Sequence, residues 1–286
     1  MPTKQAGVIG HPLTHSVSPA MFQAAFNAAG IDATYEAWPT TADELEGRLN
    51  ALRGDDMLGA NVTIPHKEAV IPMLDRLDER AEAAGAVNVI ANDRGDLVGY
   101  NTDVGGFDRS LREDAGFDPR GKRTAILGAG GAARAVAYAL VQGRASIVQL
   151  AGRTPRRLEA LTANLRQTTP PGVTITWCHW MDGVFMTVLP KVHLLVNCTP
   201  VGLSGSDTDG QSPLPDEFLP ANGLVFDVLY NPAETPLMKA ATAKGAKAVG
   251  GLGMLVYQAA EAFQLWTGQD APIDEMRKAA EKAVGA

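Results

Sequence analysis

The fold is decided by the stretch Arg123-Thr124-Ala125-Ile126-Leu127-Gly128-Ala129-Gly130-Gly131-Ala132-Ala133-Arg134. An apolar run leads into the spacing G-x-G-x-x-A, which predicts a buried strand, a tight turn and the start of a helix. Gly128 permits the turn, Gly130 lets a ligand approach the backbone, and the small Ala133 lets the helix pack on the strand. The N–H groups that open such a helix bind phosphate. The predicted pyrophosphate contacts are therefore Gly128, Ala129, Gly130, Gly131 and Ala132.

A second strand-like run follows this turn and identifies the cofactor. The run Ser146–Leu150 lies about 20 residues further on, where a dinucleotide-binding unit places the residue that contacts the ribose. It leads to Arg153, Arg156 and Arg157, where a site for NAD would carry an acidic residue. Because a guanidinium binds a phosphate through two parallel hydrogen bonds, the sequence predicts NADP rather than NAD.

Composition excludes several classes of function. The chain has 286 residues, a formal net charge of -7 and a charged fraction of 20%, without the basic surplus of a nucleic-acid-binding protein. No apolar run approaches the ~20 residues of a membrane span, and residues 1–10 lack the apolar core of a signal peptide. Cys178 and Cys198 are the two cysteines, and the sequence has no cysteine and histidine pattern typical of a zinc site, so no metal site is predicted. We expect a cytoplasmic protein that binds neither nucleic acid nor membranes.

The pattern of apolar runs predicts an α/β protein of two domains. Strand candidates alternate with amphipathic helices up to residue 103, including a hairpin turn at residues 93–96. Six more strands, near residues 124, 146, 173, 194, 224 and 247, complete a Rossmann-type doubly wound parallel sheet, and the last two helices then return to the first domain. We predict an α/β substrate-binding domain of residues 1–103 plus 252–286, and an NADP domain of residues 104–251.

An NADP site implies hydride transfer, which requires a neighbouring acid or base. Lys67 and Asp103 each end a strand-like segment of the first domain, where ligands of open α/β sheets bind. Each side chain also has an ordinary structural interpretation. A lysine at a helix start is commonly a solvated charge, and an aspartate there is commonly an N-cap. Residue type and position alone do not decide between these roles.

Several ordered motifs resemble those of the shikimate dehydrogenase family, and the resemblance runs nearly from end to end. Residues 10–19, GHPLTHSVSP, are similar to the motif that holds the substrate carboxylate in that family. The segments Asn61–Lys67, Gly85–Asn88 and Asn101–Asp103 are similar to its catalytic segments. Residues 128–133 with Arg153-Thr154 resemble its NADP motifs, and DVLYNP at 227–232 and GLGMLVYQA at 251–259 also match.

The resemblance implies a role for each matched residue. Ser16 and Ser18 would hold the substrate carboxylate, and Lys67 with Asp103 would form the catalytic pair. The ring hydroxyls would bind Asn61, Thr63, Asn88, Asp103 and Gln258, with Tyr230 as a further substrate contact. The cofactor would also contact Arg153, Thr154, Arg157 and Gly251. Ordinary alternatives remain for three of these: a helix cap for Ser18, an interhelical hydrogen bond for Gln258 and a place at the core rim for Tyr230.

Two opposing effects decide the chemistry of Lys67. A neighbouring carboxylate favours the ammonium form, whereas burial favours the neutral amine. Since the pKa of a free lysine is about 10.4, we expect Lys67 to donate a proton during ketone reduction, with Asp103 as its positioning partner and as a hydroxyl acceptor.

The resemblance implies an NADP-dependent oxidoreductase that interconverts 3-dehydroshikimate and shikimate in aromatic amino-acid biosynthesis. Quinate and an amino analogue of shikimate are the alternative substrates, and Ser18 favours shikimate, because relatives that oxidise quinate often carry threonine there. Gly152 replaces an asparagine that often precedes the Arg-Thr pair, which removes a hydrogen bond to the adenosine end of the cofactor. A non-catalytic NADP-binding regulator is the alternative from another class, although a regulator would need neither Lys67 nor Asp103. A homodimer is left open.

Overall fold

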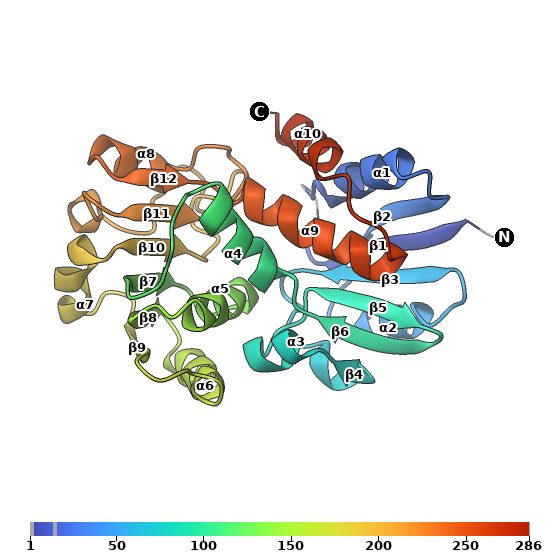
Figure 1. Cartoon of the computed structure of the whole chain (residues 1–286), viewed down its shortest axis with the longest axis horizontal. Helices are drawn as coiled ribbons and strands as arrows, with labels where there is room; N and C mark the ends of the chain where they lie inside the picture. The colour runs from blue at the N-terminus through green and yellow to red at the C-terminus, as the bar shows by residue number, and fades with distance from the viewer. Residues whose placement is uncertain (1–2, 14–15, 286) are drawn as a thin grey trace. The chain divides into compact units, whose positions relative to one another are not determined.

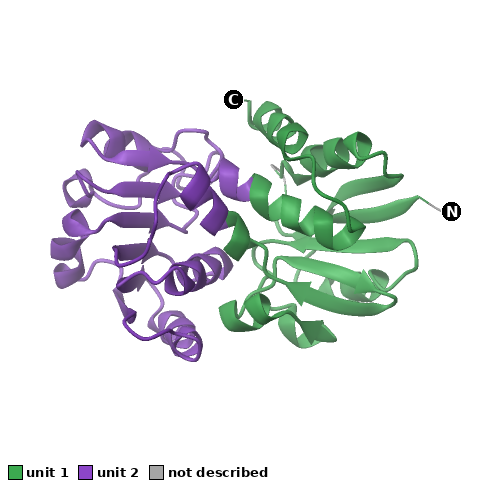
Figure 2. Ribbon diagram, viewed as in Figure 1, with its two compact units in different colours: residues 1–106, 256–286 green, residues 107–255 purple. Residues whose placement is uncertain are grey.

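The computed structural model describes residues 3–13 and 16–285. The chain divides into two compact units, shown in different colours in Figure 2. Unit 1 comprises residues 1–106 and 256–286, and unit 2 comprises residues 107–255. Both divisions fall inside helices, namely α4 (Asp103–Glu113) and α9 (Leu252–Thr267).

Unit 2 is built on a parallel sheet of six strands in the order β12-β11-β10-β7-β8-β9. Every neighbouring pair in it is parallel. The order changes direction between β7 and β10, and ligands of such sheets bind beyond the carboxyl ends of the strands at this point. All six strands predicted for this region are confirmed: β7 (Arg123–Leu127), β8 (Ile147–Gly152), β9 (Thr174–His179), β10 (Leu194–Asn197), β11 (Leu224–Asp227) and β12 (Lys247–Val249).

Three helices of unit 2 begin where the sequence supplies a cap or a proline. Thr235 caps α8 (Pro236–Ala243), and Asp182 caps α7 (Gly183–Val188). Proline is the first residue of α6 (Pro155–Arg166), where its missing N–H costs no hydrogen bond. Two 3-10 turns occupy Leu189–Lys191 and Asp216–Phe218. The helix that follows the glycine turn is α5 (Gly131–Gln142), which is largely buried.

Unit 1 contains a mixed sheet of six strands in the order β2-β1-β3-β5-β6-β4 (Figure 1). Strand β1 is parallel to β2 and β3, β5 is antiparallel to β3 and β6, and β4 is parallel to β6. The predicted hairpin is confirmed, with Arg94 and Gly95 at positive φ between β5 and β6. The strands are β1 (Lys4–Gly10), β2 (Ala33–Pro39), β3 (Met57–Val62), β4 (Arg76–Leu77), β5 (Val89–Asp93) and β6 (Asp96–Tyr100).

Helices α1 (Ser18–Ala28) and α9 carry aromatic residues of the core of unit 1, and α10 (Ile273–Val284) follows α9. Phe22 and Phe26 of α1 meet Trp266 and Phe263 of α9, with ring centroids 5.3 and 5.7 Å apart. Helix α10 packs beside α1 (Figure 1). The remaining helices are α2 (Leu45–Ala51), α3 (Glu79–Ala84) and a 3-10 turn at Ile71–Met73. No helix in the described part of the chain is long and apolar enough to cross a membrane.

The start of α1 corrects one structural interpretation of the sequence. Ser18 is the first residue of the helix, and Val17 occupies the N-cap position without a capping side chain. The interpretation of Ser18 as a helix cap is therefore wrong. Its hydroxyl is instead a hydrogen-bond partner of the Tyr35 phenol.

Candidate active site

One edge of the sheet in unit 1 gathers the polar residues singled out by their motifs. Because β5 runs antiparallel to both β3 and β6, its start lies beside the ends of those strands. Asn61 is therefore level with Val89, and Asn88 stands just before β5. Lys67 follows β3, and Asp103 follows β6. Strand direction thus brings together residues that are far apart in the sequence.

Asn88 is the hub of this cluster. Its side chain is buried, and its amide nitrogen lies 2.9 Å from Thr102 Oγ1, 3.0 Å from Asp103 Oδ1 and 3.1 Å from Gln258 Oε1. Its amide oxygen accepts the backbone N–H of Thr102 at 2.7 Å. Strands β5 and β6 and helix α9 are therefore held in one arrangement by a single side chain.

Lys67 and Asp103 form an ion pair at the edge of this hub. Lys67 Nζ donates to Asp103 Oδ2, and the two side chains are only 15% and 7% exposed. The interpretation of Lys67 as a solvated surface charge is therefore wrong. Asp103 is not the helix cap either, because Asn101 Oδ1 accepts the N–H of Val104 at the start of α4. A partly exposed ammonium held by a buried carboxylate can donate a proton to a neighbouring oxygen.

The remaining predicted substrate contacts of unit 1 are placed as follows. Ser16 is half-buried shortly before α1, and Thr63 is half-buried just after β3, where its N–H donates to Ile9. Gln258 of α9 is buried and accepts from Asn88 and from Thr102 Oγ1, the latter at 3.4 Å. Thr14 and His15 of the first motif lie outside the described residues.

Sequence reasoning missed two members of the cluster. Thr102 lies in a motif but has no predicted role. It makes two hydrogen bonds with Asn88, accepting through Oγ1 and donating through its backbone N–H. Tyr35 of β2 was not singled out, yet its phenol donates to Asn61 Oδ1 at 2.6 Å. A tyrosine within an alternating strand indicates burial, but nothing local in the sequence indicates its partner.

In unit 2, the glycine turn has the geometry that a pyrophosphate requires. Gly128 has φ +118°, and a Cβ there would lie 3.1 Å from the Cys198 carbonyl oxygen, so a larger residue would be strained. Gly130 is the N-cap of α5, where no side chain accepts from the first amides, and the space above its Cα is open. Ala129, Gly131 and Ala132 are half-buried in the same turn. The residues present therefore fit an anionic group at this helix N-terminus.

Arginines are exposed next to this turn, at the end of β8. Arg153, Thr154 and Arg157 are all exposed, as is Arg156. Arg153 follows Gly152, the last residue of β8, which pairs with β7 in parallel. Exposed guanidinium groups at the end of the strand next to the glycine turn fit the 2′-phosphate of NADP.

Two predicted contacts, Tyr230 and Gly251, belong to unit 2 rather than to the polar cluster. Tyr230 follows β11 and is half-buried, and burial raises the pKa of its phenol. Gly251 is required for close packing, because a Cβ there would come within 2.0 Å of the Val228 carbonyl oxygen. Its N–H already donates to Leu229 O at 2.9 Å. These contacts give Gly251 a structural function, and its contact with a cofactor stays a prediction.

A buried carboxylate orders the loops that follow β10 and β11. Asp227 accepts from Thr235 Oγ1 at 2.7 Å, from Asn197 Nδ2 at 3.0 Å and from the N–H of Leu229 at 3.1 Å. Burial raises the pKa of Asp227 to about 6, although these hydrogen bonds oppose the shift. The network connects the carboxyl ends of the two strands that continue the sheet beyond the switch point.

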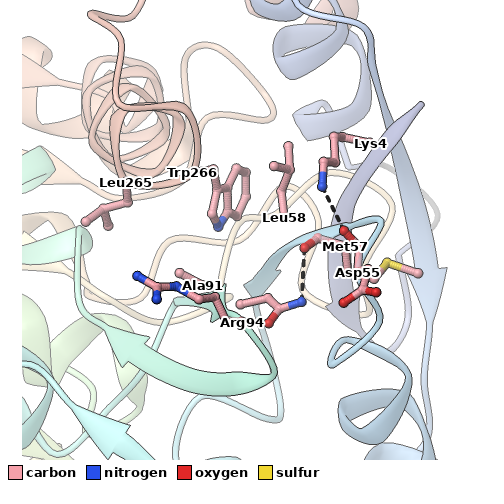
Figure 3. Close-up of a pocket in the computed structure, with 9 residues that line it drawn as sticks. Lys4, Asp55, Met57, Leu58, Ala91, Arg94, Leu265 and Trp266 are labelled. Carbon is pink, nitrogen blue, oxygen red and sulfur yellow. Dashed lines mark hydrogen bonds between the residues drawn. The ribbon is translucent and has the colours of Figure 1, made fainter. Parts of the chain in front are cut away.

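A separate pocket of about 330 Å³ lies at the opposite end of the strands of unit 1 (Figure 3). Lys4 and Met57, which begin β1 and β3, line it together with Arg94 and Trp266. It contains no residue of the polar cluster, so it is distinct from the site around the ion pair. Among the described residues, no group of histidine, cysteine or acidic side chains could hold a metal ion.

Comparison with known proteins agrees with this geometry. Residues 8–90 match the shikimate dehydrogenase substrate binding domain, and residues 251–281 match the shikimate 5'-dehydrogenase C-terminal domain. The shikimate dehydrogenase (NADP(+)) of Methanopyrus kandleri is 43% identical over 97% of this chain and 94% of its own length.

Solved structures are similar over the same extent. Shikimate 5-dehydrogenase from Thermus thermophilus, in complex with NADP(H) and shikimate, is 38% identical, with a TM-score of 0.85 over 98% of this chain and 99% of that one. Quinate dehydrogenase from Corynebacterium glutamicum, in complex with NAD, is 32% identical, with a TM-score of 0.86 over 97% and 98% of the two chains. Identity at this level over almost the whole length places the chain in a single family: it belongs to the shikimate dehydrogenases.

Proposed function

We propose that the chain is an NADP-dependent shikimate dehydrogenase, which reduces 3-dehydroshikimate to shikimate reversibly in aromatic amino-acid biosynthesis. The observation that carries the proposal is the ion pair of Lys67 with Asp103, set in the hydrogen-bonded cluster around Asn88. The curated relatives of nearly equal length support it, because they are named shikimate dehydrogenase (NADP(+)).

Lys67 is the proton donor of this reaction. NADPH, when bound, would supply a hydride to the keto carbon of the substrate. As the C=O bond becomes a C–O single bond, the oxygen takes a proton from the Lys67 ammonium, and the product is a secondary alcohol. Asp103 holds the ammonium in place through Oδ2. In the reverse direction, the Lys67 amine takes the hydroxyl proton back.

The polar cluster accounts for recognition of a polyhydroxylated acid. Asn61, Asn88 and Gln258 are amide side chains with less than a tenth of their surface exposed. Together with Thr63 and Asp103 they hold the ring hydroxyls, while Ser16 and Ser18 hold the carboxylate. An analogue that lacks a hydroxyl would leave one of these buried groups without a partner, which costs about 1–3 kcal/mol. Selectivity of this enzyme therefore depends on hydrogen bonds more than on shape.

Unit 2 supplies the cofactor contacts. The turn from Gly128 to Ala132 holds the pyrophosphate, and Arg153, Thr154 and Arg157 hold the 2′-phosphate of NADP. Tyr230 contributes a further substrate contact, and Gly251 lies beside the cofactor. The exposed arginines support NADP over NAD, since NAD offers them no phosphate at that position.

Quinate is the second candidate substrate, because a relative of similar fold is named quinate dehydrogenase. The serine at position 18 favours shikimate. A non-catalytic NADP-binding regulator would have no use for the ion pair of Lys67 and Asp103. A cytoplasmic location and a homodimer stay predictions, which fractionation and light scattering would test.

A spectrophotometric screen tests the proposed function. Formation of NADPH or NADH is followed with shikimate and quinate as separate substrates and with each cofactor in turn. We expect kcat/KM to be highest for shikimate with NADP, by about tenfold or more over each other combination, which corresponds to ~1.4 kcal/mol. Higher efficiency with quinate would reassign the substrate, and absence of turnover with all four combinations would contradict the proposal.

A further inference from the structure

Tyr35 is held rigidly within unit 1 at the level of the substrate residues. It lies on β2, is 5% exposed, and its ring stacks on Phe22 with centroids 4.4 Å apart and an interplanar angle of 2°. Trp266 of α9 packs against the same ring at 6.3 Å. A ring fixed on these sides keeps its hydroxyl in one place.

The Tyr35 hydroxyl reaches two residues that lie on different elements. It donates to Oδ1 of Asn61 on β3 at 2.6 Å, and the Ser18 hydroxyl of α1 is also bonded to it. Strand β1 runs between β2 and β3, and its residue level with Tyr35 is Ala6. A methyl group is small enough to let the phenol extend across β1 toward Asn61.

The hydrogen bond between Tyr35 and Asn61 has a direction, and this direction decides whether the carbonyl oxygen or the NH₂ group of Asn61 points to Tyr35. Burial raises the pKa of Tyr35 well above its usual value, so the phenol keeps its proton at neutral pH and acts as a donor. The carbonyl end of Asn61 must then point to Tyr35, and the NH₂ end points away. One N–H of that group donates to Asn88 O at 3.4 Å, and no residue in the described part of the chain accepts the other, which is therefore open to a ligand oxygen.

We propose that Tyr35 is a positioning residue of the substrate site, which fixes the orientation of the Asn61 amide and the place of the Ser18 hydroxyl. This inference rests on the proposed function, since Asn61 and Ser18 are assigned there to the substrate. A phenylalanine at position 35 would keep the stacked ring but lose the hydroxyl. The Asn61 amide could then rotate by half a turn and present an oxygen where the substrate requires a donor.

The first test is steady-state kinetics of Tyr35→Phe beside the wild-type protein. We expect KM for shikimate to rise about tenfold, as the loss of one oriented hydrogen bond predicts, while KM for NADP changes by less than about twofold. Tyr138→Phe, which removes a tyrosine hydroxyl from α5 of unit 2, is the control and should leave KM for shikimate unchanged. If Tyr35→Phe left KM for shikimate unchanged while the wild type was active, the positioning role of Tyr35 would be contradicted, and the proposed function would stand.

A double-mutant cycle separates positioning from general structural support. In an Asn61→Ala background, Tyr35→Phe should raise KM for shikimate by clearly less than about tenfold, because the amide that it orients is gone and only the Ser18 hydroxyl is left to position. A full tenfold increase in both backgrounds would show that Tyr35 acts through the fold in general and would contradict the proposal.

A second cycle covers the case in which Tyr35→Phe does not fold. Ser18→Ala and Asn61→Ala are then compared singly and together in a protein that keeps Tyr35. Since the phenol connects both residues, we expect their effects on KM for shikimate to be non-additive, and strictly multiplicative effects would refute the connection. If the wild-type protein did not oxidise shikimate, both the proposed function and this inference would be contradicted.

Discussion

The sites proposed for the two ligands are built by different physical means in the two units. In unit 1 the site consists of side chains, and a single amide at Asn88 reaches three acceptors from other segments. In unit 2 the central part is backbone: a glycine at positive φ, an open space over Gly130 and the uncapped start of α5. The first arrangement suits a small polyol with many hydroxyls, whereas the second suits a phosphate chain.

This difference determines how each region responds to substitution. A network of buried side chains loses several partners when one member is removed, because each remaining group then lacks a hydrogen bond. A backbone site tolerates side-chain changes except where a Cβ has no room, and we expect its specificity to depend on exposed charges such as Arg153. We therefore expect large effects in unit 1 and smaller, cofactor-specific effects in unit 2.

Lys67→Ala should give the largest effect. Removal of the proposed proton donor should lower kcat for shikimate oxidation by about 10³-fold, within the range typical of general acid–base catalysis. KM for NADP should stay within about twofold of the wild-type value. Lys4→Ala, at the opposite end of the strands of unit 1, is the matched control and should retain full activity. Near-normal turnover in Lys67→Ala would exclude its catalytic role.

Asn88→Ala should give the next largest effect. Its loss leaves Thr102, Asp103 and Gln258 each with one partner fewer, so we expect kcat/KM for shikimate to fall about 100-fold and the free energy of unfolding to fall by about 2 kcal/mol. Asn92→Ala is the comparison, since Asn92 donates to Gly54 O and Met57 O outside the cluster. That control should lose stability but not activity. Equal losses of activity in Asn88→Ala and Asn92→Ala would contradict a specific role of the cluster around Asn88 in the reaction with shikimate.

The contrast between the units also explains what the sequence could predict. The glycine turn, the six strands of unit 2 and the hairpin at residues 93–96 are local patterns, and the structure confirms each of them. Strand β4 was missed because its two residues are too few to show an alternation.

The cluster in unit 1 depends on contacts between distant segments. Asn88 and Gln258 are 170 positions apart, and only the family resemblance pointed to them. Tyr35 belongs to no motif, and the role proposed for it rests on its contacts with Phe22, Asn61 and Ser18, which local sequence does not show. The helix-cap interpretations of Ser18 and Asp103 were wrong because local sequence cannot show the tertiary partners, Tyr35 and Lys67, that engage these side chains.

Arg153→Ala tests the cofactor preference of unit 2. Loss of a charge-assisted contact with the 2′-phosphate should raise KM for NADP by about tenfold or more, while KM for NAD stays within twofold. Arg166→Ala, at the end of α6, serves as the control for removal of an exposed arginine. A proportional increase of both KM values would contradict the proposed phosphate contact.

Asp227→Asn should have the smallest effect on activity, and its expected effect is on stability against pH. The folded pKa of Asp227 is raised to about 6 from 3.8, so its contribution to stability is fully present below pH 3.8 and is lost as pH rises through 6. Relative to the variant, the wild type should lose on the order of 2–3 kcal/mol over this interval. Denaturant unfolding of both proteins between pH 3.5 and 7, a range chosen to bracket the shift, measures the difference. Parallel curves would contradict the raised pKa.

The separation of tasks between the units is tested most directly by crossed kinetics of Asn88→Ala and Arg153→Ala. KM for shikimate and KM for NADP are determined for both variants under the same conditions. We predict that Asn88→Ala changes the shikimate value and leaves the NADP value within about twofold, and that Arg153→Ala does the reverse. If each variant changed both constants to the same extent, the assignment of substrate to unit 1 and cofactor to unit 2 would be contradicted.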